Sequence, residues 1–132
     1  MSYLLDTNIV SDLMRHPSGQ VAARIRQVGQ TIVFTSVLVI AEIRFGLAKR
    51  PSRSLESQFN AIVTKLHTLE LASSADEHYA LLRCHLERKG NPIGNIDMLI
   101  AAHALSLDFV LVTANEREFS RVSGLKVENW LA

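Results

Sequence analysis

Four acidic side chains occupy positions in this sequence where a carboxylate is costly without a partner. Asp6 follows a short apolar run, and Glu42 interrupts an apolar stretch. Asp97 comes at the start of another apolar stretch, and Glu118 directly precedes Phe119. A carboxylate among apolar residues is unfavourable unless it is paired or bound to a metal ion. Any one of the four alone could instead be a helix cap, a salt-bridge partner or a solvated residue.

A divalent metal ion would explain all four carboxylates together. Carboxylates that converge repel one another and raise each other's pKa values, and a hard cation relieves that repulsion. Mg²⁺ and Mn²⁺ prefer oxygen ligands and retain water in their coordination shells. The pattern therefore suggests an acidic cluster for metal-assisted phosphodiester chemistry. Asp97 would also lie in the first turn of a helix, where the helix dipole favours its ionised form.

Short apolar strands alternate with amphipathic helices along the chain, which predicts how these acids are positioned. We expect strands at 3–5, 31–34, 68–71 and 109–112 and an edge strand at 126–130. We expect helices at 9–14, 21–28, 37–45, 55–66, 75–89 and 96–107 and a helical turn at 115–119. This alternation predicts an α/β fold of three layers, with a mostly parallel sheet of about five short strands and helices on both faces. The site should lie beyond the carboxyl ends of the strands.

Local signals predict where several helices begin and end. The pair Thr35-Ser36 predicts a cap for the helix that carries Glu42, and Gly46 predicts its end. Ser74-x-x-Glu77 has the spacing of a capping box, and Asn95 is the predicted N-cap of the helix that carries Asp97.

Composition places the chain among globular domains. Its 132 residues include 14 Lys and Arg against 13 Asp and Glu, for a net charge of +1, which argues against binding nucleic acid by bulk charge. No apolar run is long enough to span a membrane, and no signal peptide is visible at the start. The lone Cys84 cannot form an internal disulfide and fits a reducing cytoplasm.

Other reactive residue types form no recognisable motif. The five histidines lack zinc-binding spacing, and His103 falls on an apolar helix stripe, as a core residue would. We expect Cys84 to be an inert packed thiol. Neither a glycine-rich phosphate loop nor a G-x-S-x-G motif is present.

The chain resembles the PIN-domain family, and more closely the VapC toxins of bacterial VapBC toxin–antitoxin pairs. The resemblance extends over the whole chain, in order, and rests on the segments 4–8, 41–46, 92–104, 113–119 and 127–130. It implies a single PIN domain over residues 1–132 and an endoribonuclease that depends on Mg²⁺ or Mn²⁺. It also implies that Asp6 and Asp97 hold the metal, while Glu42 and Glu118 orient metal or water.

The fourth acid departs from the pattern of many PIN domains, which have Asp where this chain has Asn115. Glu118 is the predicted fourth acid because related toxins share its Arg-Glu-Phe setting, and Glu116 is the alternative. Thr7 and Asn8 would hold the loop around the first aspartate, with Asn115 in a supporting position.

The resemblance further implies partners. VapC-like enzymes cut a structured RNA at one site, commonly in tRNA and sometimes in large ribosomal RNA. They are silenced by a VapB-like antitoxin and form homodimers and larger complexes with it. Operator DNA would be contacted only through the antitoxin, no membrane would be involved, and the protein would act in the cytoplasm.

Three other functions compete with this interpretation. A haloacid-dehalogenase phosphatase needs a second Asp where this chain has Asn8, and a receiver domain needs a mid-chain Asp that is absent between Asp12 and Asp76. The third alternative is a catalytically inactive PIN-like module that binds RNA or protein. Metal-dependent turnover that one conservative substitution removes would separate it from the nuclease.

Overall fold

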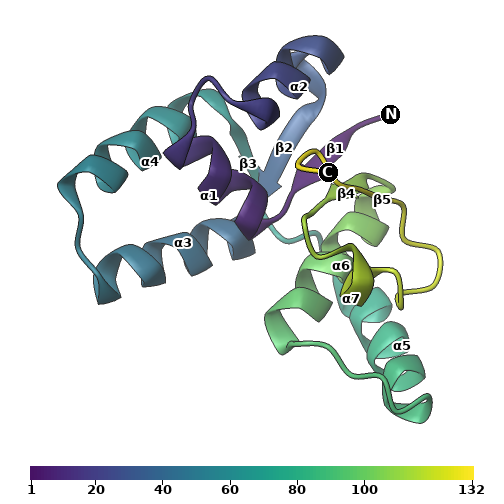
Figure 1. Cartoon of the computed structure of the whole chain (residues 1–132). Coiled ribbons are helices and arrows are strands. Elements are labelled where there is room, and N and C mark those ends of the chain that lie inside the picture. Colours follow the sequence, from purple (N-terminus) through teal and green to yellow (C-terminus); the bar gives the residue numbers. More distant parts are fainter.

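The computed structural model describes residues 1–132 and contains a five-stranded sheet with helices on both faces (Figure 1). The strands are β1 (Tyr3–Leu5), β2 (Val33–Ser36), β3 (His67–Leu69), β4 (Val110–Val112) and β5 (Val127–Glu128). The helices are α1 (Thr7–Arg15), α2 (Gln20–Val28), α3 (Val37–Lys49), α4 (Arg53–Lys65), α5 (Ala75–Arg88), α6 (Asn95–Leu107) and α7 (Glu116–Phe119).

The sheet has the order β3-β2-β1-β4-β5, and every neighbouring pair is parallel. Leu5 at the end of β1 lies level with Thr35 of β2 and Val112 of β4. Because the strands run in the same direction and end at similar levels, the residues that follow them emerge at one edge. The predicted mostly parallel sheet of about five strands is confirmed.

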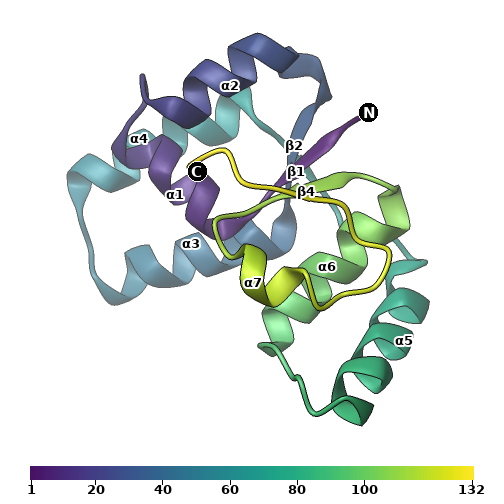
Figure 2. The ribbon, with the colours of Figure 1, turned by 45° about the vertical axis from the view of Figure 1, so that its right-hand side comes forward.

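The helices form two groups around the sheet. Figures 1 and 2 show α1, α2, α3 and α4 to one side and α5, α6 and α7 to the other. Helix α3 contacts both α1 and α6. Side chains of α3 therefore lie between α1, which follows β1, and α6, which precedes β4. The predicted arrangement of three layers is confirmed.

Several helix and strand boundaries differ from the predictions. A 3₁₀ turn occupies Gln30–Ile32, so β2 begins later than predicted. Gly46 does not end α3, which continues to Lys49, because Gly46 does not adopt the positive φ of a helix-ending glycine and Pro51 comes only afterwards. The cap predicted at Thr35-Ser36 is confirmed and is Ser36, whose side chain accepts a hydrogen bond from the backbone N–H of Leu38.

Two predicted caps are wrong. Ser74 has helical backbone angles and its side chain makes no capping hydrogen bond, so the capping box does not form. Asn95 is the first residue of α6, and Gly94 is the capping position before it. In both cases the sequence pattern fitted a cap, but the backbone is already helical at that residue.

The core lies between the sheet and its helices, with Leu4, Leu5 and Phe119 fully buried. His103 is also fully buried, as predicted. The prediction of a packed Cys84 is wrong, because that residue lies on the exposed face of α5. None of the helices combines the length and apolar character that crossing a membrane requires.

Candidate active site

Asp6 is the most buried acid of the predicted cluster, with only 3% of its surface exposed. It follows β1 and has an extended backbone, so it is the residue that precedes α1. Its side chain does not cap that helix. Instead, the hydroxyl of Thr113 donates a hydrogen bond to Oδ2 at 2.7 Å, while Oδ1 is buried without any partner. An unsatisfied buried carboxylate oxygen is unfavourable unless something binds there.

Glu42 and Thr7 connect α3 to the start of α1. The hydroxyl of Thr7 donates a hydrogen bond of 2.5 Å to Oε1 of Glu42. Asn8 makes a second connection at this corner, because its Oδ1 accepts a hydrogen bond of 3.1 Å from the backbone N–H of Ala114. Both residues therefore tie the turn after Asp6 to neighbouring segments.

Asp97 completes the group from the first turn of α6. Burial raises its pKa to about 6, and the negative charges of Asp6, Glu42 and Glu118 add to that rise. The pKa of Asp6 is also raised, first by burial and then by the charge of Glu42, although hydrogen bonds from Thr113 and the backbone of Thr7 oppose the rise. The fold thus brings together acids from the end of β1 and from α3, α6 and α7.

The two candidates for the fourth acid are placed differently. Glu118 is half-buried and lies close enough to raise the pKa of Asp97. Glu116 is exposed, and its Oε2 accepts a hydrogen bond of 3.2 Å from the side chain of Asn129. Neither glutamate lines the hollow formed by the other three acids, whereas Asn115 does.

That hollow, which we call the acidic hollow, has a volume of about 560 Å³. It is lined by Asp6, Thr7, Asn8, Ser11, Asp12, Arg15, Glu42, Asp97, Asn115 and Leu131. The sequence analysis did not single out four of these residues, Ser11, Asp12, Arg15 and Leu131. The first three share one face of α1 with Asn8, at helical spacing, and that polar stripe was a usable signal. Leu131 gave no signal.

The residues of the acidic hollow fit a hard divalent cation. The carboxylates of Asp6, Glu42 and Asp97 offer oxygen ligands and repel one another, and Oδ1 of Asp6 lacks a partner. No three of the carboxylates form a ready-made set of ligands for one ion.

Comparison with known proteins identifies the family. A PIN domain model matches residues 3–125. The chain belongs to the PIN-domain family. This PIN domain is 34% identical over 132 residues to "Ribonuclease VapC2" of Rickettsia felis, with 98% of each chain covered. It is 33% identical, with the same coverage, to the "tRNA(fMet)-specific endonuclease VapC" of Shigella flexneri.

Solved structures show the same PIN fold. VapBC2 from Rickettsia felis, bound to a DNA fragment from its promoter, matches with a TM-score of 0.91 at 31% identity. That match covers 98% of this chain and 99% of the other. DNA-bound VapBC from Salmonella typhimurium matches with a TM-score of 0.86 at 28% identity, and 98% of each chain is covered. The resemblance to PIN domains and to VapC proteins is confirmed.

Proposed function

We propose that this PIN domain is the toxin of a type II toxin–antitoxin pair and cuts RNA as a metal-dependent endoribonuclease. The observation that carries the proposal is the convergence of Asp6, Glu42 and Asp97 on one hollow at the carboxyl edge of the sheet. The ribonuclease names of full-length relatives support the reaction. The unpartnered Oδ1 of Asp6 supports the use of a metal.

In this proposal, Asp6 and Asp97 hold Mg²⁺ or Mn²⁺, and Glu42 and Glu118 orient the ion or a water molecule beside it. When bound, the ion activates water and offsets negative charge on the phosphate. Thr113 fixes one carboxylate oxygen of Asp6 and leaves the other available.

Two further contacts prepare the same site. Thr7 fixes Oε1 of Glu42, so the second oxygen of that carboxylate is free to accept a hydrogen bond from water. Asn8 anchors the segment that carries Asn115 and Glu118 through its bond to Ala114. Preorganised groups of this kind reduce the reorganisation needed during reaction.

The substrate we propose is a structured RNA cut at one site. Because the Shigella flexneri relative is named for tRNA(fMet), initiator tRNA is the first candidate, followed by other tRNAs and large ribosomal RNA. The VapBC complexes among the structural relatives support a VapB-like antitoxin as partner, through which operator DNA would be bound. We further propose a single functional domain over residues 1–132, a homodimer, larger complexes with antitoxin, and action in the cytoplasm, where these RNAs are found.

Cleavage of cellular RNA by the antitoxin-free protein tests the proposal. Total RNA is incubated with Mg²⁺, with Mn²⁺ and with excess chelator, and the new RNA ends are mapped. We expect a few discrete cuts that require the metal and disappear in Asp97→Asn. Cuts that persist in this variant would show that the site assignment is wrong. Absence of cuts from the folded protein, on total RNA and purified initiator tRNA, would favour the inactive RNA- or protein-binding module.

A further inference from the structure

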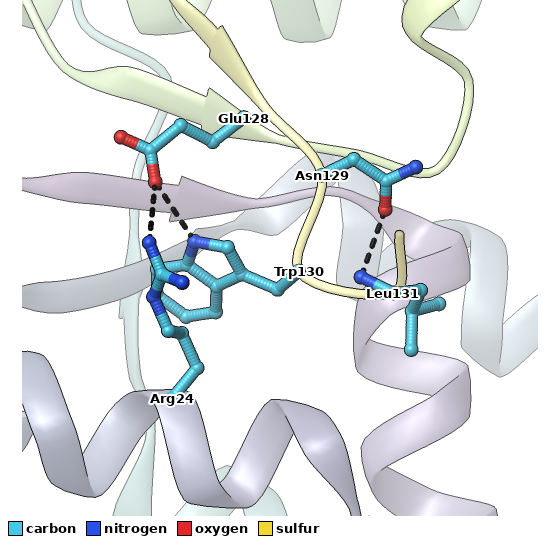
Figure 3. Close-up of polar contacts among 5 residues, drawn as sticks. All are labelled: Arg24, Glu128, Asn129, Trp130 and Leu131. Atoms are coloured by element: carbon cyan, nitrogen blue, oxygen red, sulfur yellow. Dashed lines mark hydrogen bonds and ion pairs between the residues drawn. The ribbon is translucent and has the colours of Figure 1, made fainter.

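The C-terminal tail is fixed across the molecule rather than loosely attached. Trp130 is 5% exposed and packs against Tyr3, with ring centroids 5.2 Å apart. Its Nε1 donates a hydrogen bond of 3.0 Å to Oε1 of Glu128, and the same oxygen lies 3.5 Å from a guanidinium nitrogen of Arg24 (Figure 3). The Arg24 guanidinium also lies 5.7 Å from the centre of the Trp130 ring. These contacts attach the tail to β1 and α2.

This anchoring places Leu131 beside the active site. The backbone N–H of Leu131 donates a hydrogen bond of 2.9 Å to Oδ1 of Asn129, which turns the chain just after Trp130. Figure 3 shows the Leu131 side chain in front of a helix, and that helix is α1. Leu131 is half-buried and is the only hydrophobic residue that lines the acidic hollow. An apolar side chain there has no role in holding a metal ion.

Arg15 is the only cation that lines the same hollow. It lies in the last turn of α1, is exposed, and makes no ion pair or hydrogen bond. Asp12, one turn earlier, also lines the hollow and is not paired with Arg15. A free guanidinium at the edge of a site with four carboxylates is well suited to attract a phosphate that those carboxylates would repel.

We propose that Arg15 and Leu131 form a nucleotide-binding subsite on the α1 side of the acidic hollow. In this subsite Arg15 binds a phosphate adjacent to the one that is cut, and Leu131 packs against the base or ribose of the same nucleotide. An RNA strand presents both a charged backbone and apolar base faces, so a paired cation and apolar residue match it better than either alone. The subsite rests on the proposed ribonuclease function and extends it to the recognition of substrate.

Binding of RNA at different salt concentrations separates the two contacts. Asp97→Asn serves as the parent, so that the probe, a short single-stranded RNA with a 5′ fluorescein label, stays intact in Mg²⁺. Arg15→Gln should weaken binding on the order of tenfold and lower the slope of log K against log salt by about 0.7, because one phosphate contact is lost. Arg15→Lys should keep most of the slope. Leu131→Ala should weaken binding by about two- to fivefold without changing the slope, because no counterion is involved.

Two matched variants control for general effects of charge and hydrophobicity. Arg53→Gln on α4 and Leu81→Ala on α5 alter exposed residues that do not line the hollow, and both should bind RNA like the parent. Thermal melts of all variants exclude loss of fold. If Arg15→Gln retains the slope of the parent, or if Leu131→Ala retains its affinity, the subsite is wrong.

Cleavage assays in the wild-type background, with Asp97 intact, separate the subsite proposal from the proposed ribonuclease function. If wild-type protein cuts RNA and both variants keep its KM, the subsite alone fails. If wild-type protein cuts no RNA but the binding effects appear, the subsite stands as part of a binding module and the ribonuclease proposal fails. If the parent binds no RNA and wild-type protein cuts none, both proposals are overturned, and a protein partner becomes the better candidate for this surface.

Discussion

Thr113 and Asp6 are 107 positions apart in the sequence, yet the Thr113 hydroxyl lies 2.7 Å from Oδ2 of Asp6. The parallel pairing of β1 with β4 creates this contact, because each residue directly follows its strand. The same hydroxyl accepts a hydrogen bond of 3.0 Å from the backbone N–H of Asn115. Since its proton is donated to Asp6 and a lone pair is used by Asn115, the orientation of the hydroxyl is fixed.

Replacing Thr113 with Val keeps the shape of the side chain and removes the hydroxyl. We expect Thr113→Val to lower the free energy of unfolding by about 1–3 kcal/mol, because the buried carboxylate of Asp6 would lose its one side-chain donor. Urea denaturation without metal measures the loss, and Thr113→Ser, which retains the hydroxyl, should recover most of it. A Val variant as stable as the wild type would show that the contact contributes little.

The fold could be predicted well from the sequence because its signals are periodic and local. Apolar runs such as Tyr3–Leu5 predicted the strands, and helical spacing predicted the helices between them. Boundaries were predicted less well. Gly46 carries a helix-ending signal, but it does not adopt the positive φ of a helix-ending glycine, and α3 continues to Lys49.

The candidate site was predictable only where residue type conflicted with its surroundings. Asp6, Glu42 and Asp97 stood out as acids in apolar stretches, and the fold places all three in one hollow. Thr113 carried no such conflict, since a hydroxyl after a strand is ordinary. Leu131 could not be identified because its position depends on the anchoring of Trp130, which only the tertiary structure reveals.

Without metal, ionised Asp97 should destabilise the fold. Its folded pKa of about 6 lies above the ordinary value of 3.8 for an aspartate, so the folded state binds more protons between these two pH values. The contribution of Asp97 to the free energy of unfolding therefore falls as pH rises through that window. His103 acts in the opposite direction, because burial lowers its pKa in the folded state. Its contribution to the free energy of unfolding is lost as pH falls below the pKa of the unfolded state, near 6.5.

The difference between two proteins isolates the contribution of Asp97. Thermal melts at pH 5 and pH 7 should show that Asp97→Asn gains stability relative to the wild type as pH rises, because only the wild type acquires the extra charge. His103 is common to both proteins, so its effect cancels. If the difference in stability between Asp97→Asn and the wild type is the same at both pH values, the fold does not raise the pKa of Asp97.

Metal should stabilise the folded protein through the same carboxylates. At ten times its Kd, Mn²⁺ or Mg²⁺ should add about 1.4 kcal/mol to the free energy of unfolding, because it binds only the folded state. Differential scanning fluorimetry at pH 7 measures the rise in Tm. Asp6→Asn and Asp97→Asn should each reduce it, whereas Asp76→Asn, which changes an exposed aspartate on α5 outside the hollow, should not. An equal rise in all variants would place the binding elsewhere.

The last prediction distinguishes Glu118 from Glu116. Glu118 raises the pKa of Asp97, whereas Glu116 is engaged with Asn129 at the surface. Glu118→Gln should therefore lower the pKa of Asp97, as followed by NMR, and reduce RNA cleavage by about 10- to 100-fold, the usual effect of removing a group that supports a metal site. Glu116→Gln should leave both quantities near their wild-type values. If instead Glu116→Gln abolishes cleavage while Glu118→Gln retains it, the fourth acid is Glu116, and α7 must rotate when RNA or metal binds.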